Sequence, residues 1–129
     1  MAAVGEGDLP VGASAFQKLL KYQSDFKLLA GSVEKRKSEV DQKEILNIKQ
    51  FLKGLANEYY DMDLLSKSIT DTSKREKAVQ VAKDFRTTIR ACDDALTAGG
   101  VDDLLAKYPQ GAQYLVDFFE LLNDVPDEL

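Results

Sequence analysis

Apolar residues separated by steps of three and four positions dominate the segment between residues 45 and 69. Because an α-helix turns once every 3.6 residues, this spacing places them on one side of a helix, whereas a strand would alternate at every second residue. The segment is therefore predicted to form one long amphipathic helix, interrupted on its apolar side at Ser66. Its apolar residues are Ile45, Ile48, Leu52, Leu55, Tyr59, Met62 and Ile69.

The same spacing recurs in three further segments. The sequence therefore predicts four helices, at about residues 14–36, 39–70, 74–98 and 101–123. The three further apolar stripes are Phe16, Leu19, Phe26 and Val33; Ala78, Val81, Phe85, Ile89, Cys92 and Leu96; and Val101, Leu104, Tyr108, Ala112, Leu115, Phe118 and Leu122.

Short motifs agree with these bounds. Ser14-x-x-Gln17 and Ser73-x-x-Glu76 match the capping box, in which a hydroxyl accepts from a helix-initial amide. Gly99-Gly100 can supply the left-handed residue that ends a helix. Pro109 lies inside the fourth predicted helix, and we expect it to kink that helix or split it into a short piece and a longer one.

Short turns between long helices make consecutive helices antiparallel, so an all-α, up-down-up-down four-helix bundle is predicted. The length of 129 residues suits one domain. We expect the bundle to occupy residues 14–123, between a flexible N-terminal segment at 1–13 and a C-terminal tail at 124–129. No run approaches the roughly 18 apolar residues that span a bilayer. A transmembrane segment is therefore not expected.

The composition excludes many catalytic and metal sites. With no histidine and one cysteine, the chain lacks Ser–His–Asp and Cys–His pairs, His-containing zinc sites and intrachain disulfides. Cys92 lies on an apolar stripe beside Asp93 and Asp94, which favours a buried structural thiol. Adjacent acids such as Asp102 and Asp103 point about 100° apart on a helix, which favours solvated surface over a metal site. We expect no cofactor, no metal and no enzymatic activity.

Charge is distributed unevenly along the chain. The net charge of −5 argues against general nucleic-acid binding, because duplex affinity depends on Lys and Arg that neutralise phosphates. Residues 1–90 carry 16 basic and 13 acidic residues, a net of +3. Residues 91–129 carry one basic residue, Lys107, and nine acidic ones, a net of −8. We expect an electrically lopsided molecule whose last helix faces away from an acidic partner.

Two basic clusters are the best candidates in the sequence for docking on an acidic partner. In the predicted topology they lie at opposite ends of the bundle. Such clusters are also common as solubilising surface, and that alternative stays open. Tyr22 and Tyr60 lie off the main stripes and are candidate exposed contacts. The cluster residues are Lys35, Arg36 and Lys37 at one end and Lys74, Arg75 and Lys77 at the other.

The segment Glu44–Phe51 reads E-I-L-N-I-K-Q-F and resembles the E-I-L-N-V-K-Q-F stretch of the PsbQ family. Lys107-Tyr108, followed by Gly111 and an amphipathic run, is similar to that family's last helix. The likeness extends over about residues 40–123. Plant members have a proline-containing break soon after the motif and a long proline-rich N-terminal arm. Here the stripe runs on to Ile69, a whole predicted helix (14–36) precedes the motif and the arm is absent, so this chain is more similar to a divergent algal member, of the red-alga or diatom kind.

The resemblance implies a four-helix bundle that serves as a non-catalytic extrinsic subunit of photosystem II. It implies a place in the chloroplast thylakoid lumen, peripheral to the membrane, after removal of a presequence. The implied partners are the photosystem II core and the other extrinsic subunits, joined by a chain that is monomeric before docking. The implied role is to help the oxygen-evolving complex retain calcium and chloride without ligating its metals. The alternative is a helical-bundle adaptor or chaperone that holds a partner helix in an exposed apolar groove.

Overall fold

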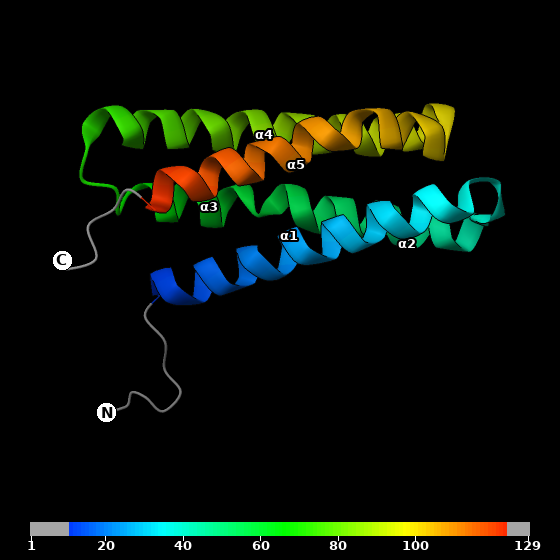
Figure 1. The fold of residues 1–129 in the computed structure, drawn as a ribbon, viewed down its shortest axis with the longest axis horizontal. Coiled ribbons are helices and arrows are strands. Elements are labelled where there is room, and N and C mark those ends of the chain that lie inside the picture. The colour runs from blue at the N-terminus through cyan, green and yellow to red at the C-terminus, as the bar shows by residue number, and fades with distance from the viewer. Residues whose placement is uncertain (1–10, 124–129) are drawn as a thin grey trace, which may run out of the picture.

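The computed structural model describes residues 11–123, and all regular structure in that range is helical (Figure 1). Helices α2 and α3 follow one another along a single arm. The chain therefore forms an up-down-up-down bundle of α1, the α2–α3 arm, α4 and α5, which confirms the predicted fold class. The elements are α1 (Val11–Arg36), the 3₁₀ turn η1 (Lys37–Glu39), α2 (Gln42–Asn57), α3 (Tyr59–Ser66), α4 (Thr72–Gly99) and α5 (Val101–Asn123).

The four arms of the bundle pack in a ring. Helix α4 lies between α5 and the α2–α3 arm, and α1 closes the ring through contacts with α3 and α5. The start of α1, the turn between α3 and α4 and the end of α5 lie at one end of the bundle (Figure 1). The α1–α2 connection and the α4–α5 turn lie at the other end. Helix α5 is consequently diagonal to the α2–α3 arm.

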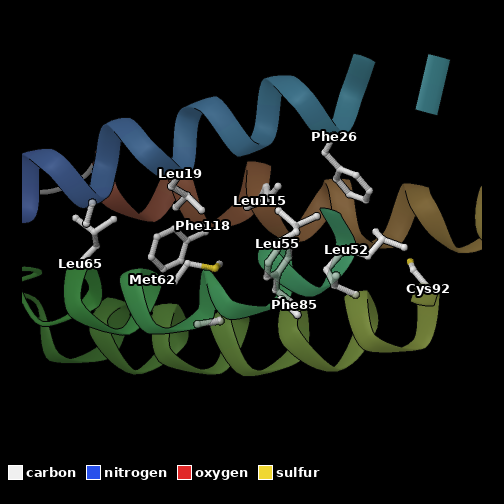
Figure 2. Close-up of a cluster of buried hydrophobic side chains, with 14 of the residues drawn as sticks. Leu19, Phe26, Leu52, Leu55, Met62, Leu65, Phe85, Cys92, Leu115 and Phe118 are labelled. Carbon is white, nitrogen blue, oxygen red and sulfur yellow. The ribbon is translucent and has the colours of Figure 1, made fainter. Parts of the chain in front are cut away.

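The four apolar stripes meet along the axis of this ring. Figure 2 shows side chains from every arm pointing into one cluster, among them Leu19 of α1, Phe85 of α4 and Phe118 of α5, each fully buried. The interruption at Ser66 is buried as well, and its hydroxyl donates to the carbonyl oxygen of Met62 at 2.8 Å. This bond satisfies the one polar side chain on the long stripe, so the stripe remains a core surface.

At Gly111, helix α5 packs closely against side chains of both its neighbours. A Cβ atom at this position would lie 2.8 Å from Cδ1 of Ile89 on α4 and 3.5 Å from Cε2 of Phe26 on α1. The missing side chain therefore lets three helices converge around the ring of Phe26, which also meets Tyr108 edge-on at 4.7 Å.

Neither serine that the sequence favours as a cap begins its helix. Helix α1 begins at Val11, so Ser14 lies inside it and residues 11–13 are helical, contrary to the expected flexible segment. Residues 1–10 and 124–129 lie outside the described range. Asp71 caps α4 and accepts from the amide of Lys74 at 3.0 Å. A carboxylate accepts more strongly than a hydroxyl and favours the positive end of the helix dipole, which explains why Asp71 wins over Ser73.

The second helix also begins and ends away from the predicted positions 39 and 70. Asp41 forms a capping box with Glu44, so α2 starts at Gln42. The arm is then broken at Glu58, whose amide bonds to the carbonyl oxygen of Leu55 instead of continuing the α-helical pattern. Glu58 lies on the inner side of the arm, with 2% of its surface exposed.

The last helix is not split at its proline. Helix α5 runs unbroken from Val101 to Asn123, with the exposed Pro109 inside it. Its ring lies on the solvent side and removes one backbone donor, which the many remaining bonds and the buried stripe outweigh. The turn before α5 is as predicted, since Gly100 takes a positive φ of 84° and caps α4.

Candidate functional site: a basic groove between the α2–α3 arm and α4

The first predicted docking cluster lies where α1 passes into η1. Arg36 is engaged locally, because its guanidinium donates to both carboxylate oxygens of Glu44 and to the carbonyl oxygen of Glu39. The hydrogen bond from Arg36 lowers the pKa of Glu44. Arg36 therefore ties α1 to the first turn of α2, while Lys35 and Lys37 are exposed.

The second predicted cluster lies in the first turns of α4, at the other end of the bundle. Arg75 donates to the carbonyl oxygen of Ile69 at 3.0 Å and so holds the turn between α3 and α4. Lys77 lines a hollow between α4 and α5 whose wall also includes Asp117. Docking through Lys74, Arg75 and Lys77, or through the first cluster, stays a prediction.

A third cationic surface follows the contact between the α2–α3 arm and α4. It comprises two open hollows of about 350 and about 300 Å³ that share Arg90. Lys83, Arg86 and Arg90 follow one another at helical spacing on one face of α4, and Lys53 of α2 lines the first hollow with Arg90. We refer to these four residues, together with Tyr59 of α3, as the basic groove.

The positive charge of the basic groove is not balanced by acids nearby. Within residues 11–123, the ion pairs involve other cations, and none joins Lys53, Lys83, Arg86 or Arg90 to a carboxylate. Asp93 lines one end of the groove but is bonded by Lys49, with 2.6 Å between Nζ and Oδ1. The groove therefore presents net positive charge to solvent and attracts anionic groups.

Arg86 is held in place by an aromatic ring. Its guanidinium carbon lies 4.7 Å from the centroid of the Tyr59 ring, a cation–π contact. The ring covers one face of the guanidinium, whereas the N–H donors radiate from its edge in the plane that a carboxylate can bind with two bonds. Because the side chain is already ordered, binding an anion costs less conformational entropy than it would for a free arginine.

A pair of carboxyl groups, the buried Glu58 and the half-buried Asp61, lies on the opposite side of the arm, against α1. Nζ of Lys18 is 3.5 Å from Oε2 of Glu58 and 3.1 Å from Oδ2 of Asp61. Burial and the charge of Asp61 raise the pKa of Glu58 to about 7, against the opposing effect of Lys18. Oε1 of Glu58 has no hydrogen-bond partner within the described chain. With 2% exposure, this carboxyl group is shielded from a substrate and has the character of a titrating group inside the fold.

The other sequence candidates have structural positions. Cys92 is fully buried, as predicted, and burial raises the pKa of its thiol to about 11, far from that of a reactive thiolate. Asp93 is paired, while Asp94, Asp102 and Asp103 are exposed. Between residues 11 and 123, no three acids or cysteines are grouped in a way that could hold a metal ion.

The two candidate tyrosines differ. Tyr60 is 64% exposed, which confirms its prediction, and its ring lies edge-on to Tyr59. Tyr22 is half-buried and packs on Phe51, so it is not the exposed contact that we expected. Its hydroxyl lies 2.8 Å from where a Cβ of Gly54 would be. Gly54 therefore admits the ring between α1 and α2.

Neither the basic groove nor the Glu58–Asp61 pair is among the sites predicted from the sequence. The signal for the groove was present, because Lys83, Arg86 and Arg90 fall at helical spacing. A signal for Glu58 is also present, because it lies three positions after Leu55 and four before Met62, which is the spacing of the apolar stripe itself.

Comparison with known proteins gives no relative. No protein-family profile matches the sequence, no curated protein matches it, and no solved structure matches the fold. None of the helices between residues 11 and 123 combines the length and apolar character needed to cross a bilayer. What the fold and site define is an all-α four-helix bundle with an unbalanced cationic groove along one side.

Proposed function

We propose that this protein is a non-catalytic docking subunit that binds an acidic protein surface through the basic groove. The observation that carries the proposal is the set of four groove cations without acidic partners in the described chain. Exposed ion pairs contribute at most about 1 kcal/mol each to stability. Leaving these cations unpaired therefore costs the fold little and keeps them available to a partner.

We further propose that the partner surface is the lumenal side of photosystem II. The chain would then be an extrinsic subunit of PsbQ type in the thylakoid lumen. It would contact the core or the other extrinsic subunits and help to retain calcium and chloride.

The proposal is supported by the motif Glu44–Phe51 together with the four-helix fold. In this chain the motif has structural duties, because Glu44 completes the cap of α2, Lys49 bonds Asp93 across to α4, and Phe51 packs against Phe26. The motif therefore supports a shared fold, and the basic groove supports docking.

Rebinding to salt-washed photosystem II particles tests the proposal. At low ionic strength the protein is expected to sediment with the particles and to raise oxygen evolution when calcium or chloride is limiting. The double variant Lys53→Glu, Arg90→Glu should lose at least about tenfold in affinity, because reversed charges repel an acidic surface. Lys27→Glu reverses one charge on an exposed face of α1, away from the groove, and this control should bind nearly as tightly as the wild type.

Two results would contradict the proposal. Absence of binding at low ionic strength would remove the photosystem II assignment. Equal losses for the groove variant and the Lys27 control would remove the basic groove as the docking surface. A larger loss on reversing Lys74 and Lys77 would instead assign docking to the end cluster.

The adaptor or chaperone alternative requires an exposed apolar strip. In residues 11–123 the four stripes bury one another, and the large exposed apolar side chains are spread over α1, α2, α3 and α5. No contiguous apolar groove is outlined by these residues, so the structure gives the alternative less support than it gives electrostatic docking.

A further inference from the structure

The basic groove is bordered by large apolar side chains that face solvent. Tyr60 is 64% exposed, and its ring lies 6.0 Å from the guanidinium carbon of Arg86 and 5.3 Å from the ring of Tyr59. Leu64, one turn further along α3, is 39% exposed. Tyr60 and Leu64 therefore form an apolar ridge on the outer face of α3, which meets the basic groove at Tyr60 and Arg86.

The ridge has the chemistry of an interface anchor. Tyrosine and arginine often dominate the binding energy of interfaces, and tyrosine combines a large apolar area with a polar group and few rotatable bonds. Tyr60 is additionally steadied by its edge-on contact with Tyr59, whose other neighbour is Arg86. Little ordering is left to occur on binding, so most of the contact energy is available for affinity.

We propose that Tyr60 and Leu64 form an apolar anchor beside the basic groove, and that the partner is an acidic protein segment with a large apolar side chain next to its carboxylates. The inference rests on the proposed docking function and names the chemistry of its partner. The cations would attract and orient the acidic groups, whereas the anchor would set how long the complex lasts.

The anchor favours a protein partner over a nucleic acid. Nucleic-acid affinity comes mostly from phosphate neutralisation, and the chain as a whole carries a net charge of −5. A nucleobase could stack on Tyr60, but the aliphatic side chain of Leu64 offers nothing to a phosphate backbone. An apolar side chain of a peptide would cover both residues.

The test uses two fluorescein-labelled acidic peptides, one with a central phenylalanine and one with serine in its place. Fluorescence anisotropy at low ionic strength should show that the wild-type protein binds the phenylalanine peptide about tenfold more tightly. Tyr60→Ser should remove this preference and leave the salt dependence unchanged. Lys53→Glu, Arg90→Glu should weaken both peptides equally and keep the preference.

Leu28→Ser is the matched control, because Leu28 is 69% exposed on α1, away from the groove. It should keep the wild-type preference, and circular dichroism should show that both serine variants remain folded. The inference is overturned if the wild type does not bind or does not discriminate between the peptides, if Tyr60→Ser still discriminates, or if a labelled single-stranded oligonucleotide binds more tightly than either peptide. Such failures leave the rebinding experiment with photosystem II particles untouched, so the two proposals fail separately.

Discussion

Glu58 is buried in the folded protein, and this burial disfavours the ionised form of its carboxyl group. It is 2% exposed, and burial followed by the negative charge of Asp61 raises its pKa from 4.5 to about 7. The folded chain therefore holds the proton more tightly than the unfolded chain does. The stabilisation linked to this proton is complete below about pH 4.5 and is lost as the pH rises through about 7.

Replacing Glu58 with glutamine should make the protein more stable in mild alkali but not in acid. At about pH 8, Glu58→Gln is expected to raise the free energy of unfolding by about 1–3 kcal/mol, because a buried charge is removed while Lys18 keeps Asp61 as a partner. The difference should shrink toward zero at about pH 4.5, where Glu58 itself is neutral. Urea denaturation across this range measures it.

Glu76→Gln is the control for this pH series, since Glu76 is exposed on α4. It should show no comparable pH-dependent gain. If the stability difference between Glu58→Gln and the wild type does not vary with pH, the carboxyl group does not titrate in the interior as described.

At the scale of helices, caps and close approaches decide boundaries that periodicity leaves open. Asp71 is predicted to matter and Ser73 is not, although the sequence motif points to the serine. Asp71→Ala should lower the free energy of unfolding by about 1 kcal/mol, because it removes the acceptor for the amide of Lys74 at the start of a 28-residue helix. Ser73→Ala should change it by less than about 0.5 kcal/mol. If urea denaturation shows equal losses for Asp71→Ala and Ser73→Ala, then Asp71 is not the dominant cap of α4.

Two glycines inside helices should respond in opposite ways to alanine. At Gly31 on α1 a Cβ would meet nothing within 4 Å, so Gly31→Ala should stabilise the protein by about 0.5–1 kcal/mol through helix propensity. At Gly111 a Cβ would press on Ile89 and Phe26, so Gly111→Ala should destabilise it by about 1–2 kcal/mol despite the same propensity gain. Thermal unfolding of both variants checks the contrast, and a stabilised Gly111→Ala would mean that α5 can move outward.

The helices were predictable because their periodicity reports burial, and burial is what holds them. The stripe from Ile45 to Ile69 predicts one helix, because its three- and four-residue spacing continues across the short break between α2 and α3. The partner of Glu58 is not predictable from local sequence, because Lys18 approaches it from another helix. Local sequence therefore reveals helix periodicity, but it does not reveal contacts made by residues of another helix.

The basic groove was hidden for a related reason. The spacing of Lys83, Arg86 and Arg90 is visible in the sequence, but whether a cation is free depends on which acids lie across the bundle. Asp93 is close along the chain to Arg90 and yet is taken by Lys49 of α2. The cations of the two end clusters are close together in the sequence, but this proximity does not reveal the local bonds that Arg36 and Arg75 make.

On the scale of the whole molecule, the ring of helices separates the charges. Helix α5 carries four acids and one base, Lys107, and lies diagonal to the α2–α3 arm, with the basic groove on the other side of α4. The uneven charge along the sequence thus gives the folded molecule a basic side and an acidic side. An acidic partner would be attracted to the groove and repelled by α5, so approach is oriented before contact.

This orientation predicts that the location of charge matters more than its total. Lys53→Gln, Arg90→Gln should slow association with salt-washed photosystem II particles by about tenfold at low ionic strength, and much less in high salt. Asp102→Asn, Asp103→Asn changes the net charge by the same amount in the opposite direction but should alter the rate by less than about twofold. Stopped-flow mixing at several salt concentrations measures both, and a rate that follows net charge alone would contradict the prediction.

The 28 residues of α4 make the bundle a rod about 40 Å long. The basic groove runs along its side, whereas Lys35 and Lys37 lie at one end and Lys77 toward the other. A partner that fills the groove leaves both ends uncovered. Such a rod can act as a spacer between subunits, with one attached along its length and others at its tips, and its rigid core would then fix the distance between them.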